Sequence, residues 1–447
     1  MRLCLASQTP LVLFLREQRE KPETVPLELS SLREGEDYEF TAGGVTRMVY
    51  PLLRRMREGG LLEAAHWVSL NPGAPPLLSS SGLLLHHLEL ESQRLSGYGA
   101  AKEALWRMLH GLSRETVDFL WQDGFIDYTY FNRKCAEFLL SLEKENDFDL
   151  FYIHDFQMLP LGHMLNLLKP KLFRWHLPFD EALLPEEWRP LLSLYFNSYE
   201  AVVVSCRRYL EALRSLGYRG KSVHLYPYLD LSLYGKPTRE EVEALCHRFG
   251  IREDERVVLV VARLDPMKGQ DRAIEGFARA GIPGTKLMLV GDGSFSSSKK
   301  GIGLSKGERW LGYLRGKARE LGVEDRVIFA GHLKHRELQA AYERCEVVVL
   351  PSLLEGFGLV VIEGWLYRKP CLVSRRAGVA ELIKEGENGL LFDPLLPEEL
   401  AEKLSLLLSD ERLAASLGEG GKETSSLCSL ERGVEEEARV MRELVGE

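Results

Sequence analysis

The chain has 447 residues, with 57 Lys and Arg against 66 Asp and Glu, and a formal net charge of −9. Its 45% hydrophobic and 28% charged residues are typical of a globular protein, which excludes fibrous and disordered classes. We expect two or three domains, since single cores stop growing at roughly 250–300 residues, and no nucleic-acid partner, since that would need a basic surface.

The chain shows no sign of a membrane span or a secreted framework. No stretch reaches the roughly 18–20 apolar residues that cross a bilayer. Residues 1–15 are mostly apolar, but polar residues interrupt them and no small-residue cleavage site follows. We therefore expect a first buried strand there rather than a signal peptide. The seven cysteines are scattered and form no C-x-x-C, which fits a reducing cytoplasm.

The first half alternates short apolar runs with longer amphipathic segments. Strands are expected at residues 3–6, 65–70, 150–154, 172–176 and 201–205. Helices are expected at residues 45–57, 100–110, 129–144 and 187–198. Two prolines and a glycine in residues 226–237 indicate a domain junction. We place the first domain at residues 1–228, the second at 229–428, and a C-terminal helix at 429–447, which could pack back on the first domain.

The second half alternates strands and helices strictly. Strands are expected at residues 256–262, 286–290, 326–330, 346–350 and 370–374. Helices are expected at residues 271–280, 310–321, 337–344 and 359–367. This alternation predicts a parallel sheet covered on both faces, which binds ligands beyond the carboxyl ends of its strands. The polar segment 294–310 is expected to be an insertion, either a surface loop or a mobile flap near a ligand.

A glycine-rich turn follows the fourth strand expected in this half, where the chain reads EGFGLVVIE from Glu355 to Glu363. Gly356 and Gly358 permit a tight turn and let backbone N–H groups approach a ligand. A helix starting near Leu359 would point its positive end at that ligand. The two carboxylates could accept hydrogen bonds from sugar hydroxyls. Taken alone, the same pattern also suits a turn before a core helix.

Two cations, Arg263 and Lys268, follow the first strand expected in this half. A guanidinium and an ammonium at the carboxyl end of a strand suit a pyrophosphate. Taken alone, the pattern favours a solvated basic turn.

Together the two motifs resemble the retaining glycosyltransferases of family 4. Glu355 and Glu363 match that family's E-x7-E element, and Arg263 and Lys268 match its R-x4-K pair. The segments LVGDGS and AGVAELIKEGENGLLFDP continue the resemblance, which covers residues 256–394. It implies an α/β protein of the GT-B fold, with two facing Rossmann-like doubly wound domains and an interdomain cleft.

The resemblance also implies a nucleotide-sugar donor, either UDP-, ADP- or GDP-glucose, and no essential metal. Arg263 and Lys268 would hold the donor's diphosphate, and Glu363 would meet its ribose hydroxyls. Glu355 would meet the donor sugar together with the backbone of the turn. A glycine pair before the first expected helix is similar to one that faces the donor phosphates in the family. The implied donor-binding set is Gly43, Gly44, Arg263, Lys268, Gly356, Phe357, Gly358, Leu359 and Glu363.

The first half resembles trehalose-6-phosphate synthases in four segments: YGAAKEALWRMLH, YFNRKCAEFL, YIHDFQMLPLGHML and FRWHLPFDEALLPEEW. By this resemblance Asp155 would meet the acceptor hydroxyls, and His176 would lie at the reacting centre. The implied catalytic residues are His176, Asp155 and Glu355. The implied acceptor-binding residues are Tyr98, Trp106, Asp155 and Gln157.

Departures from the synthases leave the acceptor open. Gln157 stands where they have a second histidine, and the turn reads EGFGL where they have DGMN. A family-4 trehalose synthase that joins a nucleotide-glucose to free glucose carries the same His-Asp-x-Gln. The acceptor could therefore be glucose 6-phosphate, free glucose, or another small polyol or sugar phosphate.

We interpret the chain as a retaining hexosyltransferase that makes trehalose or its phosphate. Resemblance implies front-face attack helped by the leaving phosphate, whereas a covalent route would need a carboxylate beside the anomeric carbon. Asp147 and Asp149 form a D-x-D but lead into a strand, so we assign no metal. Transfer to a glycan, a lipid-linked sugar, glycerate or fructose phosphate is one alternative. A non-catalytic nucleotide-sugar-binding regulator is another. The oligomeric state stays open, with a homodimer as one option, and we find no strong membrane signal.

Overall fold

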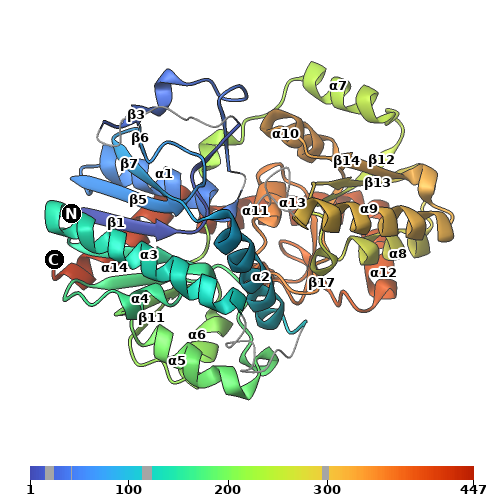
Figure 1. Ribbon diagram of the computed structural model, residues 1–447. Helices are drawn as coiled ribbons and strands as arrows, with labels where there is room; N and C mark the ends of the chain where they lie inside the picture. The colour runs from blue at the N-terminus through green and yellow to red at the C-terminus, as the bar shows by residue number, and fades with distance from the viewer. Residues whose placement is uncertain (16–24, 42, 113–122, 294–301) are drawn as a thin grey trace. The chain divides into compact units, whose positions relative to one another are not determined.

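The computed structural model describes residues 1–15, 25–41, 43–112, 123–293 and 302–447 (Figure 1). The chain forms two compact units. Unit 1 comprises Met1–Pro227 with Leu430–Glu447, and unit 2 comprises Tyr228–Ser429. Each is a Rossmann-like α/β domain built on a largely parallel sheet, which confirms the α/β, doubly wound fold class expected from the sequence.

The sheet of unit 1 has the strand order β11-β10-β9-β8-β1-β5-β7-β6-β3. All neighbours run parallel except β6 and β7. Between β1 and its neighbour β8 the direction of strand addition reverses, which is where doubly wound sheets place ligands. The strands are β1 Arg2–Ser7, β3 Leu27–Glu28, β5 Ala64–Leu70, β6 Leu77–Ser80, β7 Leu83–Leu88, β8 Leu150–His154, β9 Lys171–Arg174, β10 Ala201–Val204 and β11 Lys221–His224.

Helices cover this sheet. A separate two-stranded antiparallel sheet pairs β2 Val12–Phe14 with β4 Tyr38–Phe40. The helices are α1 Gly44–Glu58, α2 Ser92–Leu109, α3 Asp123–Asn146, α4 Leu161–Met164, α5 Arg189–Phe196, α6 Arg207–Ser215 and α14 Leu430–Val445.

Helix α2 begins at Ser92, earlier than the start at residue 100 expected from the sequence. Glycines lower helix propensity, and Gly97 and Gly99 conceal this first part of the helix. In the structure Gly97 lies tightly against α3, because a Cβ built there would come within 1.9 Å of Asp127 Oδ2. Close packing therefore outweighs the weak local preference.

The sheet of unit 2 has the order β14-β13-β12-β15-β16-β17, and all of its neighbours are parallel. Numbered from β12, this is the 3-2-1-4-5-6 order of dinucleotide-binding folds, with its switch point between β12 and β15. The strands are β12 Arg256–Val261, β13 Thr285–Val290, β14 Val327–Gly331, β15 Val347–Leu350, β16 Cys371–Ser374 and β17 Leu390–Phe392. Their near-continuous apolar runs are buried, as expected of a sheet covered on both faces.

Helix α9 of unit 2 begins at Ile302, so the second part of the expected 294–310 insertion is helical and not a loop. Residues 294–301 lie outside the described part of the chain. The helices of unit 2 are α7 Arg239–Phe249, α8 Gln270–Ala280, α9 Ile302–Glu320, α10 His335–Arg344, α11 Leu359–Leu366, α12 Pro397–Ser409 and α13 Glu411–Thr424.

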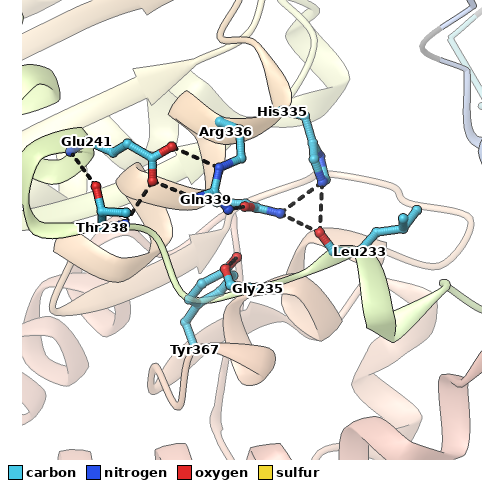
Figure 2. A network of polar contacts seen from close by, with 8 residues as sticks. All are labelled: Leu233, Gly235, Thr238, Glu241, His335, Arg336, Gln339 and Tyr367. Atoms are coloured by element: carbon cyan, nitrogen blue, oxygen red, sulfur yellow. Dashed lines mark hydrogen bonds and ion pairs between the residues drawn. The ribbon is translucent and has the colours of Figure 1, made fainter.

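The segment between β11 and α7 is fastened to α10 of unit 2 (Figure 2). The carbonyl of Leu233 accepts from Gln339 Nε2 at 2.6 Å and lies 3.1 Å from His335 Nε2. The backbone N–H of Leu229 donates to the carbonyl of Cys428 at 2.9 Å. The chain therefore enters and leaves unit 2 side by side.

The C-terminal helix α14, dark red in Figure 1, belongs to unit 1 together with the blue N-terminal strands. It packs against α1 and β8. Among the described residues, no helix is both long and apolar enough to cross a membrane.

Candidate functional site

Both motifs of unit 2 lie at the carboxyl ends of the two strands that flank its switch point. Arg263 and Lys268 follow β12, and Glu355 follows β15. Because β12 and β15 are neighbours, the fold brings the two loops together. This is the position at which open α/β sheets bind ligands.

Lys268 and Glu355 form a direct ion pair, with Lys268 Nζ 2.6 Å from Glu355 Oε2. The two side chains are 19% and 17% exposed, so the pair is shielded but accessible. The hydroxyl of Ser352 donates to the same carboxylate oxygen at 3.1 Å. Burial raises the pKa of Glu355, but Lys268, Ser352 and Arg263 outweigh it and hold that pKa below its usual range. The carboxylate is therefore charged at neutral pH.

The backbone of the cationic loop is held by Gln270, which is 1% exposed. Gln270 Nε2 donates to the carbonyl of Arg263 at 2.7 Å, and Gln270 Oε1 accepts from Trp310 Nε1 at 3.0 Å. The Arg263 side chain is 34% exposed and lies 3.6 Å from Asp265. The loop is thus rigid at its backbone and open at its guanidinium, an arrangement suited to an anionic ligand.

Glycines allow the two loops to meet. Gly269 has φ +67°, and a Cβ there would lie 2.1 Å from the carbonyl oxygen of Pro351. Gly358 precedes α11 with φ +112°. Gly356 and Phe357 directly precede Gly358 in the turn. The carbonyl of Phe357 accepts from Val379 N–H at 2.8 Å. Leu359 starts α11, so the helix N-terminus opens beside Glu355.

Glu363 lies inside α11 and is 1% exposed. Its Oε1 accepts from the hydroxyl of Tyr234 and its Oε2 from the hydroxyl of Tyr342, each at 2.7 Å. Both oxygens of this buried carboxylate are thus held by tyrosine hydroxyls within unit 2. Sequence reasoning missed both tyrosines. Tyr234 lies in a segment interpreted only as a domain junction, and Tyr342 lies within an expected helix.

In unit 1, Asp155 and His176 follow the neighbouring strands β8 and β9. The backbone N–H of His176 lies 3.4 Å from Asp155 Oδ1, and His176 Nε2 lies 3.0 Å from His154 Nδ1. Burial and the charge of Arg174 hold the pKa of His176 well below its usual range, so its ring is neutral at pH 7. Sequence reasoning did not single out His154, although it stands directly before Asp155.

Asp155 has a strained backbone and an altered acidity. Its φ of 69° and ψ of 166° lie in a region that glycine normally occupies, and such strain is concentrated at functional sites. The side chain is 9% exposed. Burial raises its pKa to about 6, against the hydrogen bonds from Phe156, His176 and Gln157 that lower it. Gln157 thus lies beside Asp155.

The two aromatic residues expected at the acceptor lie on α2 in different surroundings. Tyr98 is 2% exposed, and its hydroxyl has no hydrogen-bond partner among the described residues. It lies near Asp155, whose charge together with burial raises the tyrosine pKa. Trp106 lies about two turns further along α2, half-buried, with its ring stacked on His110 at 4.0 Å. The structure brings Tyr98, and not Trp106, next to Asp155.

The glycine pair lies at the N-terminus of α1. Gly43 is the N-cap residue and Gly44 the first residue of the helix. A Cβ at Gly43 would lie 3.7 Å from Thr9, in the loop after β1, whereas one at Gly44 would meet nothing within 4 Å. The pair therefore lies at the N-terminus of α1, which begins after β1 on the switch-point side of unit 1.

Across the described ranges, no group of three or more His, Cys, Asp or Glu side chains could hold a metal ion. Asp147 and Asp149 are used structurally: Asp147 pairs with Lys169 at 2.8 Å, and Asp149 accepts from Arg2 N–H at 2.7 Å.

The strand order and these loops define unit 2 as a doubly wound α/β domain. Comparison with known proteins adds the family: residues 242–424 match the family model of glycosyl transferases group 1. This segment of unit 2 is therefore similar to group 1 glycosyl transferases.

Two curated relatives carry the same name. D-inositol 3-phosphate glycosyltransferase of Corynebacterium glutamicum is 30% identical over 201 residues, which are 44% of this chain and 46% of that protein. Its namesake in Acidothermus cellulolyticus is 36% identical over 179 residues, which are 39% of this chain and 38% of that protein. The chain thus spans less than half the length of each relative.

Solved structures share the fold over the whole chain. Sucrose-phosphate synthase from Thermosynechococcus elongatus gives a TM-score of 0.72 at 20% identity, covering 100% of this chain and 99% of that one. A UDP-forming α,α-trehalose-phosphate synthase from Burkholderia xenovorans gives 0.74 at 16%, covering 99% of each. Anabaena HepE in complex with UDP and glucose gives 0.67 at 17%, covering 99% and 100%. The two-domain architecture is therefore that of GT-B proteins.

Proposed function

We propose that the protein is a retaining hexosyltransferase that moves a glucosyl group from a nucleotide-sugar to a small sugar or sugar phosphate. The observation that carries this proposal is the Lys268–Glu355 ion pair at the switch point of unit 2, with Arg263 beside it. It lies within the segment related to group 1 glycosyl transferases. A cytoplasmic location and the absence of a nucleic-acid partner belong to the same proposal, and a homodimer stays open.

On the donor side, Arg263 and Lys268 would hold the diphosphate and stabilise the charge that develops as it leaves. Oriented cations in a shielded site are commonly the largest contribution to such a reaction. Glu355, charged and bonded to Lys268, would orient the ammonium and accept from a hydroxyl of the donor sugar. Glu363 would accept from the ribose, and the N–H groups of Phe357 and its neighbours in the turn would line the site.

On the acceptor side, Asp155 would accept from acceptor hydroxyls, and neutral His176 would lie at the reacting centre. The strained backbone of Asp155 and the partnerless hydroxyl of Tyr98 support a ligand site here. Gln157 would complete the acceptor contacts, with Trp106 further out. Attack on the front face, with the leaving phosphate taking the acceptor proton, needs no covalent carboxylate.

Trehalose or trehalose phosphate is the product that we favour, since trehalose-phosphate synthases share the fold and unit 1 carries the Asp155–His176 pairing. Transfer to an inositol phosphate is the second candidate, favoured by the names of the curated relatives. These candidates differ in the acceptor and not in the donor half of the reaction.

The test is a matrix of UDP-, ADP- and GDP-glucose against glucose, glucose 6-phosphate, fructose 6-phosphate, glycerate and inositol 3-phosphate. Product mass and anomeric configuration are recorded by mass spectrometry and NMR. An α-linked trehalose or trehalose phosphate supports the proposal, whereas an inositol glycoside supports the second candidate. Nucleotide binding without transfer to any acceptor would instead favour a non-catalytic regulator.

A further inference from the structure

A buried ion pair lies beside the histidines of unit 1. Arg174 on β9 is 1% exposed and Glu437 on α14 is fully buried, and Arg174 Nη1 contacts Glu437 Oε1. The hydroxyl of Tyr152 on β8 lies 3.0 and 2.9 Å from the two oxygens of Glu437. The second nitrogen of the guanidinium, Nη2, lies 3.3 Å from the carbonyl of Leu225. The C-terminal helix thus holds the charged guanidinium of Arg174 in place through the carboxylate of Glu437.

This charge and the histidines share one face of the sheet. Successive side chains of a strand alternate between faces, so Tyr152 and His154 lie on the same side of β8. Arg174 and His176 follow the same alternation along and just beyond β9. The Tyr152 and His154 rings are 4.1 Å apart, and the His154 and His176 rings are stacked at 5.3 Å. The carbonyl of Arg174 also accepts from Asp155 N–H at 2.9 Å.

The contact between the histidines limits their protonation. His154 Nδ1 and His176 Nε2 are 3.0 Å apart, a distance at which one nitrogen must donate and the other accept. The pair can therefore carry at most one positive charge. His154 Nε2 is buried and has no partner among the described residues. A buried N–H without a partner is rarer and costlier than a bare lone pair, so the hydrogen of His154 belongs on Nδ1.

We propose that Arg174, held by Glu437, is a positioning residue for His176. Its buried charge keeps both histidines uncharged, so that His154 Nδ1–H donates to His176 Nε2 and the hydrogen of His176 stays on Nδ1. His176 is thereby fixed as an Nδ1–H donor. The relevance of this donor to glycosyl transfer rests on the proposed function, but the state of the pair does not.

The groups around the pair agree with this arrangement. Burial and the charge of Arg174 lower the pKa of both rings, and His176 lowers that of His154 further. Tyr152 faces the pair from β8 as a neutral phenol whose pKa burial and Glu437 raise. Glu437 faces it from α14 through Arg174, and Asp155 lies at the end of β8. On β1 the register neighbour of His154 is Ser7, which is uncharged.

The test uses the full-length protein with 15N-labelled histidine. Ring nitrogen shifts are followed by NMR from pH 8 to pH 5, and signals are assigned with His154→Gln and His176→Gln. In the wild-type protein His176 should stay neutral throughout and carry its hydrogen on Nδ1. The variant Arg174→Met with Glu437→Gln removes both charges and keeps an acceptor for Tyr152. Its pair should gain a proton at a pH at least about one unit higher.

Two further variants separate charge from packing. Arg174→Lys keeps the charge and should retain the wild-type titration and tautomer. Lys221→Met with Glu443→Met removes another ion pair, which joins α14 to β11. Its side chains are 45% and 46% exposed, and its removal should leave the histidines unchanged. A wild-type His176 with its hydrogen on Nε2 would overturn the proposal. An unchanged histidine titration in the variant Arg174→Met with Glu437→Gln would also overturn it. So would a shift in Arg174→Lys as large as the shift in that double variant.

An enzyme assay then distinguishes this inference from the proposed function. If no acceptor is glycosylated but the titrations behave as expected, the positioning of His176 stands and the transferase assignment fails. If transfer occurs but the histidine titration of the doubly neutralised variant equals that of the wild type, the transferase assignment stands and the positioning role of Arg174 fails.

Discussion

Lys268 and Glu355 come from loops 87 residues apart in sequence and meet with 2.6 Å between Nζ and Oε2. Their contact joins the R-x4-K and E-x7-E motifs into one site. Because the pair is partly exposed, the Lys268 ammonium could contact a bound anion while it keeps its contact with the Glu355 carboxylate.

Lys268→Ala should lower turnover by at least ~10²-fold, since it removes a group that stabilises charge on the leaving diphosphate. The measurement is kcat with the best donor and acceptor of the matrix. Lys317→Ala is the matched control, because Lys317 pairs with Glu275 at similar exposures of 19% and 18%. Near-normal turnover of the Lys268 variant would remove this residue from the diphosphate site.

Asp155→Asn should make unit 1 more stable at pH 7.5 but not at pH 4. The folded-state pKa of about 6 is raised above the ordinary value near 3.9, so the folded state binds the proton more tightly than the unfolded state. Stability therefore falls as pH rises from about 4 to about 6, by about 2–3 kcal/mol for this group. Asn has no carboxyl group to ionise, so Asp155→Asn removes this loss of folding stability.

Urea denaturation of both proteins at pH 4 and pH 7.5 measures this difference, with Glu36→Gln, an exposed carboxylate, as control. The same substitution should raise the KM for the acceptor and leave donor binding unchanged. Weakened donor binding with normal acceptor kinetics would show that Asp155 is misplaced in the acceptor site.

Glu363→Gln should weaken donor binding by about tenfold, because a carboxylate accepts hydrogen bonds more strongly than an amide. If the carboxylate meets the ribose, the loss should depend on the ribose hydroxyls. Calorimetric titration with UDP and 2′-deoxy-UDP, or with the preferred base, measures this. The wild-type protein should prefer the ribonucleotide, and Glu363→Gln should lose most of that preference. An unchanged preference would assign Glu363 to the structural bonds with Tyr234 and Tyr342 alone.

The local sequence predicted those candidate site residues that lie together in one loop. Strands followed by glycine-rich or cationic turns predicted Arg263, Lys268 and Glu355 because each motif is contiguous. The alternation of strands and helices predicted a parallel sheet, but the strand order that joins the two loops comes from the structure. What local sequence could not supply are partners from distant segments, such as Tyr234 for Glu363, 129 residues away, or Glu437 for Arg174, 263 residues away.

Helix starts and short strands were also beyond prediction, for a related reason. Strand β3 has two residues and depends on pairing with β6, so no periodicity reveals it. Gly97 lowers helix propensity locally, yet α3 packs close to it and the helix persists.

Glu437→Ala should destabilise unit 1 by about 3–5 kcal/mol, because it leaves Arg174 charged and buried without its carboxylate. Glu443→Ala, on the same helix, should cost no more than about 1 kcal/mol, since its pair with Lys221 is nearly half exposed. Urea denaturation followed by far-UV circular dichroism measures both. Equal losses of folding stability in the two variants would contradict the claim that removing Glu437 costs more because Arg174 is buried.

Gly269→Ala should damage the donor site and not only the local backbone. Gly269 and Gly322 have nearly the same positive φ, +67° and +66°. Alanine at either position should cost roughly 1–2 kcal/mol for the left-handed conformation. At Gly322 a Cβ would meet nothing within 4 Å, whereas at Gly269 it would lie 2.1 Å from the carbonyl oxygen of Pro351. Backbone must therefore move only for the substitution at Gly269, and this movement would part the loops that carry Lys268 and Glu355. We expect Gly269→Ala to lose at least tenfold in donor affinity by calorimetry while Gly322→Ala keeps it, and equal affinities would refute the close loop contact.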